Sequence, residues 1–209
     1  MTIVALIDHG VGNLRSVDKA LAAVGADVLL TNDPDVIASA DKIVLPGVGA
    51  FGDCVRGLRE TDLWDTIKEL AQSRPMLGIC VGMQMLFESS DEMGHHTGLA
   101  LLPGKVVRFD SDQDDPADPV WRIPHTGWNQ LQPTRDSMLL NTIISGSYAY
   151  FNHSYYCLPD KSDDVLAYTE HGGTFASVVS RGHTYGIQCH PEKSQSVGLN
   201  ILRNFVEQG

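Results

Sequence analysis

The 209-residue chain is short of positive charge: 15 Lys and Arg stand against 26 Asp and Glu, for a net charge of −11. No stretch concentrates Lys or Arg, which argues against nucleic acid or an anionic membrane as the main partner. No apolar run approaches the roughly 18 residues that a membrane-spanning helix needs. The segment Met1 to Asp8 has neither a basic start nor a cleavage site, so it predicts a strand and not a signal peptide. We therefore expect a cytoplasmic protein.

Cysteine is also scarce, and no two cysteines have the C-x-x-C spacing of redox or metal sites. The four are Cys54, Cys80, Cys157 and Cys189. In a cytoplasmic chain we expect reduced thiols, any of which can be kept for reactivity. No metal-ligand spacing links Cys189, His190 and the other histidines, so we expect no metal and no other cofactor. With 43% hydrophobic residues, the chain should bury a sizeable core, and residues 1–209 are predicted to form one domain.

Short apolar runs alternate with amphipathic stretches over the first ninety or so residues. Strands are predicted at 3–7, 26–30, 42–45 and 75–79, and helices at 13–24, after Asp33, at 51–72 and at 81–89. This alternation predicts an α/β fold with a central, mostly parallel sheet flanked by helices. The second half predicts strands with short turns, which indicates a mixed or antiparallel C-terminal extension. These strands are expected at 105–109, 149–156, 165–169, 176–180 and 184–188, before a last helix at 196–207. The aspartate-rich segment 110–119 predicts a solvated loop.

The segment Gly78-Ile79-Cys80-Val81-Gly82 lies between a predicted strand and a predicted helix. This is the nucleophile-elbow arrangement with Cys in place of Ser. The two glycines permit a sharp turn that presents Cys80 in a strained position, and the start of the helix favours its thiolate. The N–H of Val81 would point to where an oxyanion develops. A small buried cysteine is the alternative, but the strand–turn–helix context favours a nucleophile.

A thiolate in acyl transfer needs a base and a group that orients the base. His190-Pro191-Glu192 follows the predicted strand at 184–188. Residues two apart in extended chain share a side, so Glu192 can accept from the ring of His190 and fix its tautomer. Cys189 would face the opposite way and serve in packing.

Pro46-Gly47-Val48-Gly49 ends the predicted strand at 42–45. Loops at the carboxyl ends of parallel strands carry ligand contacts in α/β enzymes. The N–H groups at Val48 and Gly49 could bind a carboxylate or complete an oxyanion hole, and a simple tight turn is the alternative. The loop is not a P-loop, because the Lys and Ser/Thr of that motif are missing.

Together, Gly78-Ile79-Cys80-Val81-Gly82-Met83-Gln84 and His190-Pro191-Glu192-Lys193 resemble the class I, or triad, glutamine amidotransferases. Further segments strengthen the resemblance and extend it over nearly the whole chain. They are Gly10–Leu14, Pro46–Gly52, Pro124–Asn129 and Tyr150–Tyr155.

The resemblance implies that Cys80 attacks the side-chain amide of L-glutamine and forms a glutamyl thioester. His190 would protonate the departing ammonia and then activate water, with Glu192 orienting it. Val81 and the Val48–Gly49 loop would hold the oxyanion, and Gln84 would help to hold the substrate. The resemblance further implies a heterodimer in histidine biosynthesis, in which ammonia passes to a cyclase subunit with a (β/α)₈ barrel. The partner would be contacted by Asn13, Trp128, Asn129, Tyr150 and Lys193.

Three other functions remain open on the residues alone. A related glutaminase could supply ammonia to another acceptor, as in surface-polysaccharide synthesis. A cysteine hydrolase with a similar elbow could act on peptides or γ-glutamyl bonds. A non-catalytic binding domain is disfavoured by the intact Cys80, His190 and Glu192.

Overall fold

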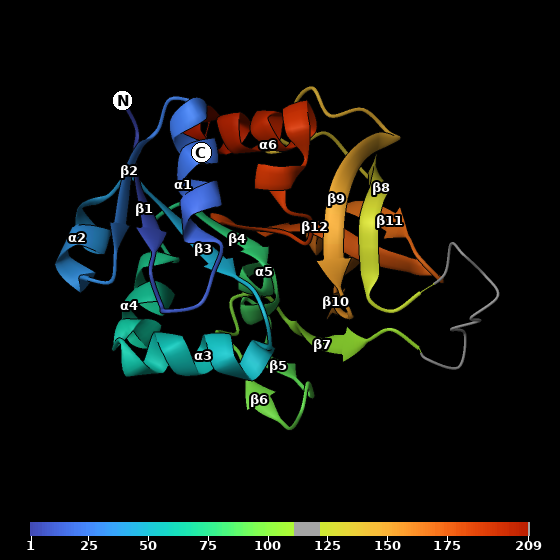
Figure 1. The fold of residues 1–209 in the computed structure, drawn as a ribbon, viewed down its shortest axis with the longest axis horizontal. Coiled ribbons are helices and arrows are strands. Elements are labelled where there is room, and N and C mark those ends of the chain that lie inside the picture. The colour runs from blue at the N-terminus through green and yellow to red at the C-terminus, as the bar shows by residue number, and fades with distance from the viewer. Residues whose placement is uncertain (111–121, 209) are drawn as a thin grey trace.

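A computed structural model describes residues 1–110 and 122–208 of the chain (Figure 1). Five parallel strands form the centre of its sheet in the order β2-β1-β3-β4-β13. Their bounds are Ile3–Ile7 for β1, Asp27–Thr31 for β2, Lys42–Gly47 for β3, Met76–Cys80 for β4 and Thr184–Ile187 for β13. Every residue of β3 and β4 is buried, as expected for strands covered on both faces. The carboxyl ends of these strands share one edge, where α/β proteins bind ligands.

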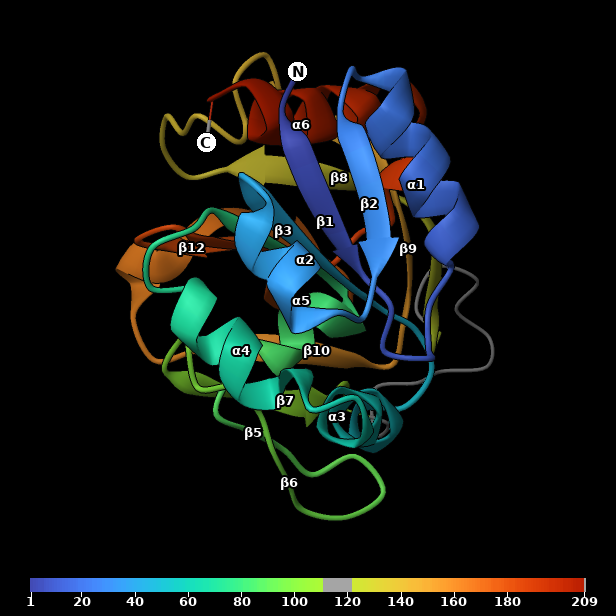
Figure 2. The same cartoon turned by 90° about the vertical axis from the view of Figure 1, so that its left-hand side faces the viewer.

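Helices cover both faces of this sheet (Figures 1 and 2). One face carries α1 (Leu14–Ala23) and α6 (Gln195–Gln208), which pack together. The other carries α2 (Pro34–Ser39), α3 (Phe51–Glu60), α4 (Leu63–Leu70) and α5 (Val81–Met85). The helix expected after Asp33 is confirmed, and Asp33 is its N-cap, because Asp33 Oδ1 accepts from the N–H of Asp35 at 2.9 Å. Within the described ranges, no helix is both long and apolar enough to cross a membrane.

The C-terminal half extends the sheet with antiparallel strands, as predicted. β12 (Thr174–Arg181) pairs antiparallel with β13 and with both β10 (Tyr155–Pro159) and β11 (Val165–Glu170). β7 (Gly104–Arg108) continues this sheet beyond β10, towards the short strands β5 (Ser89–Ser90) and β6 (His96–Thr97). β8 (His125–Pro133) and β9 (Ser147–His153) form an antiparallel pair attached through β11. The predicted loop at 110–119 lies, beyond Asp110, outside the described residues.

Two predicted helices are shorter in the structure. The helix expected at 51–72 is interrupted between α3 and α4, because Asp62 adopts a left-handed conformation with φ 57°. The helix expected at 81–89 ends at Met85. There, the Leu86 carbonyl accepts the N–H groups of Leu101 and Leu102, so contacts with a distant segment override the local preference for helix.

Two strand predictions were also incomplete. The strand expected at 149–156 divides at Ser154 into β9 and β10, which have different partners. β8 was not predicted at all. It contains polar residues and Gly127 at φ 138°, and it is held in place by β9 and β11 on either side.

Candidate active site

Cys80 lies at the predicted elbow, where β4 passes directly into α5. Its backbone has φ 55° and ψ −113°, a conformation that non-glycine residues rarely adopt and that packing must stabilise. The flanking glycines are required sterically. A Cβ on Gly78 would lie 2.6 Å from the Gly82 carbonyl oxygen, and a Cβ on Gly82 would lie 1.9 Å from that of Leu45. The elbow therefore depends on close contact between β3, β4 and α5.

His190 and Glu192 come together as predicted: Nδ1 of the ring lies 3.0 Å from Glu192 Oε1. Both side chains are buried, with 6% and 1% exposure. The route differs from the predicted extended chain, because Pro191–Lys193 forms a single 3₁₀ turn. The N–H of His190 donates to the Tyr150 carbonyl at 2.8 Å, which anchors the histidine to β9.

The electrostatics of His190 favour its charged form. Burial alone lowers the pKa of His190, but hydrogen bonds to Cys80 and Glu192, with the charges of both groups, raise it to about 10. The ring thus faces the sulfur on one side and is hydrogen-bonded to a carboxylate on the other. This arrangement suits a thiolate–imidazolium pair, the reactive form of a cysteine nucleophile.

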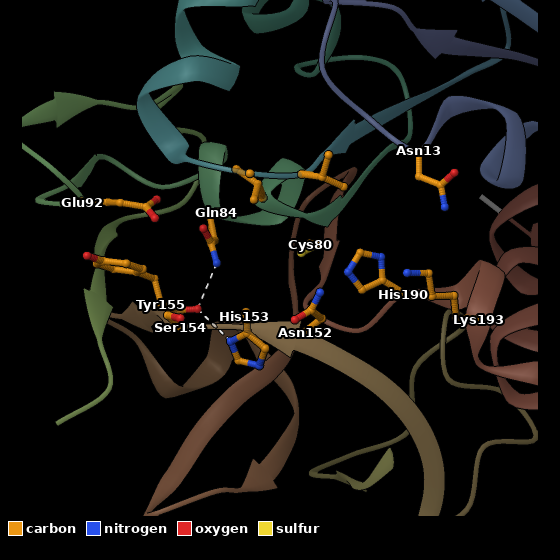
Figure 3. A pocket seen from close by; sticks show the side chains of 13 residues that line it. Asn13, Cys80, Gln84, Glu92, Asn152, His153, Ser154, Tyr155, His190 and Lys193 are labelled. Carbon is orange, nitrogen blue, oxygen red and sulfur yellow. Dashed lines mark hydrogen bonds between the residues drawn. The ribbon is translucent and has the colours of Figure 1, made fainter. Parts of the chain in front are cut away.

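A cavity of about 290 Å³ opens above Cys80 (Figure 3). Glu92, Gln84, Ser154 and Tyr155 lie at one end of it, while Asn13, His190 and Lys193 lie at the other. Cys80 lies between the two ends. Among the described residues that line it, Glu92 is the one carboxylate and Lys193 is the one lysine. The cavity is polar at both ends and has the Cys80 thiol in the middle.

The two predicted oxyanion segments line this cavity beside Cys80: Val48 and Gly49 from the loop after β3, and Val81 from α5. The loop is close because Gly47 pairs with Cys80 in the β3–β4 register. The Val48 carbonyl accepts from Cys54 Sγ at 3.4 Å, in α3. Since C=O and N–H of a trans peptide point to opposite sides, the Gly49 N–H is directed away from Cys54.

Gln84 also lines the cavity, one turn into α5. Its Nε2 donates to the Tyr155 carbonyl at 3.0 Å and to Gln188 Oε1 at 3.2 Å. Both amide hydrogens are therefore used within the chain. The remaining atom, Oε1, can accept a hydrogen bond from a ligand.

The five residues predicted at a partner interface fall into two groups. Lys193 Nζ lies 5.5 Å from the centre of the Tyr150 ring, which makes a T-shaped contact with Trp128 at 6.1 Å. Trp128 is 46% exposed, and Asn13 lines the same cavity as Lys193. Asn129 differs, because its Nδ2 donates to His125 Nε2 and to the Glu170 carbonyl within the chain.

Sequence reasoning missed Glu92 and Gln188. Glu92 lies at the cavity end opposite Lys193, and its Oε2 accepts from the N–H of Phe51 at 2.8 Å. No motif marks it, since its position depends on the β5–β6 turn. For Gln188 a signal was present in the sequence, because Gln188 lies two residues before His190 just as His190 lies two residues before Glu192. Among the described residues, no group of three His, Cys, Asp or Glu side chains could hold a metal ion.

The family model for class-I glutamine amidotransferases matches residues 5–208, nearly the whole chain. The chain belongs to this family. The glutamine amidotransferase is 48% identical to the imidazole glycerol phosphate synthase subunit HisH of Salinibacter ruber, over 96% of this chain and 92% of that one. It is 46% identical to the HisH subunit of Syntrophotalea carbinolica, over 97% and 98% of the two chains.

Solved structures agree with this amidotransferase in fold. PurLQS from Thermotoga maritima superposes with a TM-score of 0.72 at 18% identity, covering 98% of each chain. A structure described as a glutamine amidotransferase gives a TM-score of 0.73 at 18% identity, covering 99% of this chain and 98% of that one. At such identities the likeness shows the fold alone: a mostly parallel sheet with an antiparallel extension, as the sequence predicted.

Proposed function

We propose that the chain is the glutaminase subunit of an imidazole glycerol phosphate synthase, and that Cys80, His190 and Glu192 are its catalytic triad. The observation that carries the proposal is the buried chain of contacts from Glu192 through His190 to Cys80, at the floor of the cavity. The identity to HisH subunits over nearly full length supports the assignment to this enzyme.

In the proposed reaction, the Cys80 thiolate attacks the side-chain amide carbon of L-glutamine. The N–H groups of Val81 and Gly49 stabilise the oxyanion of the tetrahedral intermediate. The His190 imidazolium gives its proton to the leaving nitrogen, which departs as ammonia and leaves a glutamyl thioester. His190 then takes a proton from water, the resulting hydroxide attacks the thioester, and glutamate and the thiolate are released. Glu192 holds the ring orientation throughout.

The charges at the two ends of the cavity suggest the orientation of the substrate. The carboxylate of Glu92 and the amide oxygen of Gln84 suit the α-ammonium group of glutamine. The side-chain amide then reaches Cys80, and ammonia is released towards Asn13 and Lys193 at the opposite end. That end adjoins the exposed aromatic ring of Trp128 through the Lys193–Tyr150 contact.

We place a cyclase subunit with a (β/α)₈ barrel against this end, forming a heterodimer. The partner would contact Trp128, Tyr150, Lys193, Asn13 and Asn129. The hydrogen bond to His125 fixes the side chain of Asn129. An exposed Trp beside a Tyr is the kind of residue pair that dominates binding energy in interfaces. The cyclase would use the ammonia to make imidazole glycerol phosphate and aminoimidazole carboxamide ribotide in histidine biosynthesis. We also propose that residues 1–209 form one domain and that the protein is cytoplasmic. A cytoplasmic location is consistent with its four free cysteines.

The test is the rate of glutamate release by the chain alone and with a HisH-associated cyclase and its ligand. We expect weak hydrolysis alone and strong stimulation by the partner. Trp128→Ala should lower the stimulation without changing the basal rate. Leu30→Ala is the matched control, because Leu30 is 49% exposed but belongs to β2, far from β8 and β9 in Figure 1. Full turnover by the lone chain would favour an independent glutaminase or hydrolase. Stimulation only by another acceptor enzyme would assign a different pathway.

A further inference from the structure

We propose that Gln188 is a positioning residue for the nucleophile: its side-chain amide holds the Cys80 sulfur from the side opposite to any substrate and stabilises the thiolate. The inference rests on the proposed function of Cys80 and deepens it. It adds a second, uncharged hydrogen-bond donor to a sulfur that already faces His190.

The register of the central sheet brings Gln188 to Cys80. β13 runs parallel to β4 with Ile187 opposite Ile79, so the next residues of the two strands, Gln188 and Cys80, lie side by side. The N–H of Gln188 donates to the Ser177 carbonyl at 2.9 Å, which fixes its backbone. Side chains alternate at the end of the strand, so Gln188 and His190 serve the same site while Cys189 is fully buried in the core. One strand end thus supplies both donors to the sulfur.

The hydrogen bonds of Gln188 fix which way its amide points. Nε2 donates to Cys80 Sγ at 3.7 Å, while Oε1 accepts from Gln84 Nε2 at 3.2 Å. Turning the amide over would place Oε1 against the sulfur and two NH₂ groups against each other. Gln84 is itself fixed by its bond to the Tyr155 carbonyl at 3.0 Å (Figure 3). The donor is therefore directed at Cys80 before any substrate binds.

Burial makes this donor effective. Gln188 is 0% exposed and Gln84 2%, so water does not compete for their hydrogen bonds. An amide also keeps its hydrogens at every pH. His190 changes protonation during the reaction, whereas Gln188 donates both when the thiolate attacks and when it leaves the thioester.

The test is the pH dependence of Cys80 alkylation by iodoacetamide in the full chain, followed peptide by peptide with mass spectrometry. Gln188→Met keeps the size of the side chain and removes the donor. We expect the midpoint of the alkylation profile to move to higher pH by about one unit, so that at pH values below the midpoint the rate falls about tenfold. Gln188→Glu should move it further, because a carboxylate repels the thiolate. Gln84→Met should give a smaller shift in the same direction, since Gln188 stays but loses the partner that orients it.

Cys189→Ala is the control for packing. It alters the same strand end on its core side, so it should lower the thermal midpoint without moving the Cys80 profile. Unchanged profiles in folded Gln188→Met and Gln188→Glu would overturn the inference while leaving Cys80 as nucleophile. Should Gln188→Met fail to fold, Gln188→Glu and Gln84→Met carry the same test. If wild-type Cys80 reacts no faster than Cys54, Cys157 and Cys189, the proposed function itself fails.

Discussion

Glu192→Gln removes the charge beside His190 while keeping nearly the same shape. In the wild type, Glu192 Oε1 lies 3.0 Å from His190 Nδ1, and the carboxylate is 1% exposed. Its other oxygen, Oε2, is buried with no hydrogen-bond partner among the described residues. A buried hydrogen bond to a charged group contributes about 1.5–3 kcal/mol, which corresponds to a loss of roughly 10- to 150-fold in kcat.

The orientation of the new amide decides where in this range the variant falls. With its oxygen towards Nδ1, the ring keeps its tautomer and only the charge is lost. With its NH₂ group towards Nδ1, the proton moves to the other ring nitrogen and the loss becomes larger, as in triads with a mismatched tautomer. Because Glu192 does not line the cavity, KM should stay within about twofold of the wild type.

The assay is steady-state glutamate release in the presence of the cyclase partner, with kcat and KM determined separately. Glu69→Gln is the control, because Glu69 is an exposed carboxylate on α4 and its loss should leave both constants unchanged. A kcat within twofold of the wild type for Glu192→Gln would refute the role of Glu192. A raised KM with unchanged kcat would mean that it binds substrate instead.

Three further outcomes follow from the geometry. Glu92→Gln should raise KM for glutamine about tenfold with little change in kcat, because the ammonium group loses a charged partner. Asp91→Asn, a change at the exposed neighbouring residue, should leave KM unchanged. Gly82→Ala should lower the free energy of unfolding by at least about 2 kcal/mol in urea titrations, since its Cβ has no room. Burial lowers the pKa of His153 to about 3. Between about pH 6.5 and pH 3, the unfolded chain therefore binds a proton at His153 that the folded chain does not bind. The free energy of unfolding should fall by about 1.4 kcal/mol for each unit by which the pH drops through this range. In His153→Gln, the free energy of unfolding should therefore fall less steeply between pH 6 and pH 4, by about 1.4 kcal/mol per pH unit. An unchanged slope would contradict this role of His153. His95→Gln is the control, because His95 is exposed.

The central strands and the elbow could be predicted because their signals are local. The apolar runs of β3 and β4 directly predict parallel strands that are covered on both faces. Gly78 and Gly82 indicate the close approach of the backbone that a turn at Cys80 needs. His190 and Glu192 are two residues apart, so their contact needed no knowledge of the fold. It forms even though the local conformation is a 3₁₀ turn and not the extended chain expected.

The remainder depends on contacts between distant segments. Glu92 enters the cavity because the β5–β6 turn folds back towards α3. Gln188 meets Cys80 only through the β4–β13 register, and the two residues are 108 positions apart. β8 carries no clear alternation and is defined by its neighbours β9 and β11. Sequence patterns report on one element at a time and could not supply these pairings.

Comparison of the wild type with Cys80→Ala decides whether Cys80 forms a covalent intermediate with glutamine. Glutamate release would be measured with the cyclase partner present, alongside intact-mass spectrometry after treatment with a glutamine-like diazo-ketone. We expect a single adduct on Cys80 in the wild type, and neither adduct nor glutamate release in Cys80→Ala. Glutaminase activity that survives in folded Cys80→Ala, or an adduct on another thiol that abolishes activity, would contradict this expectation.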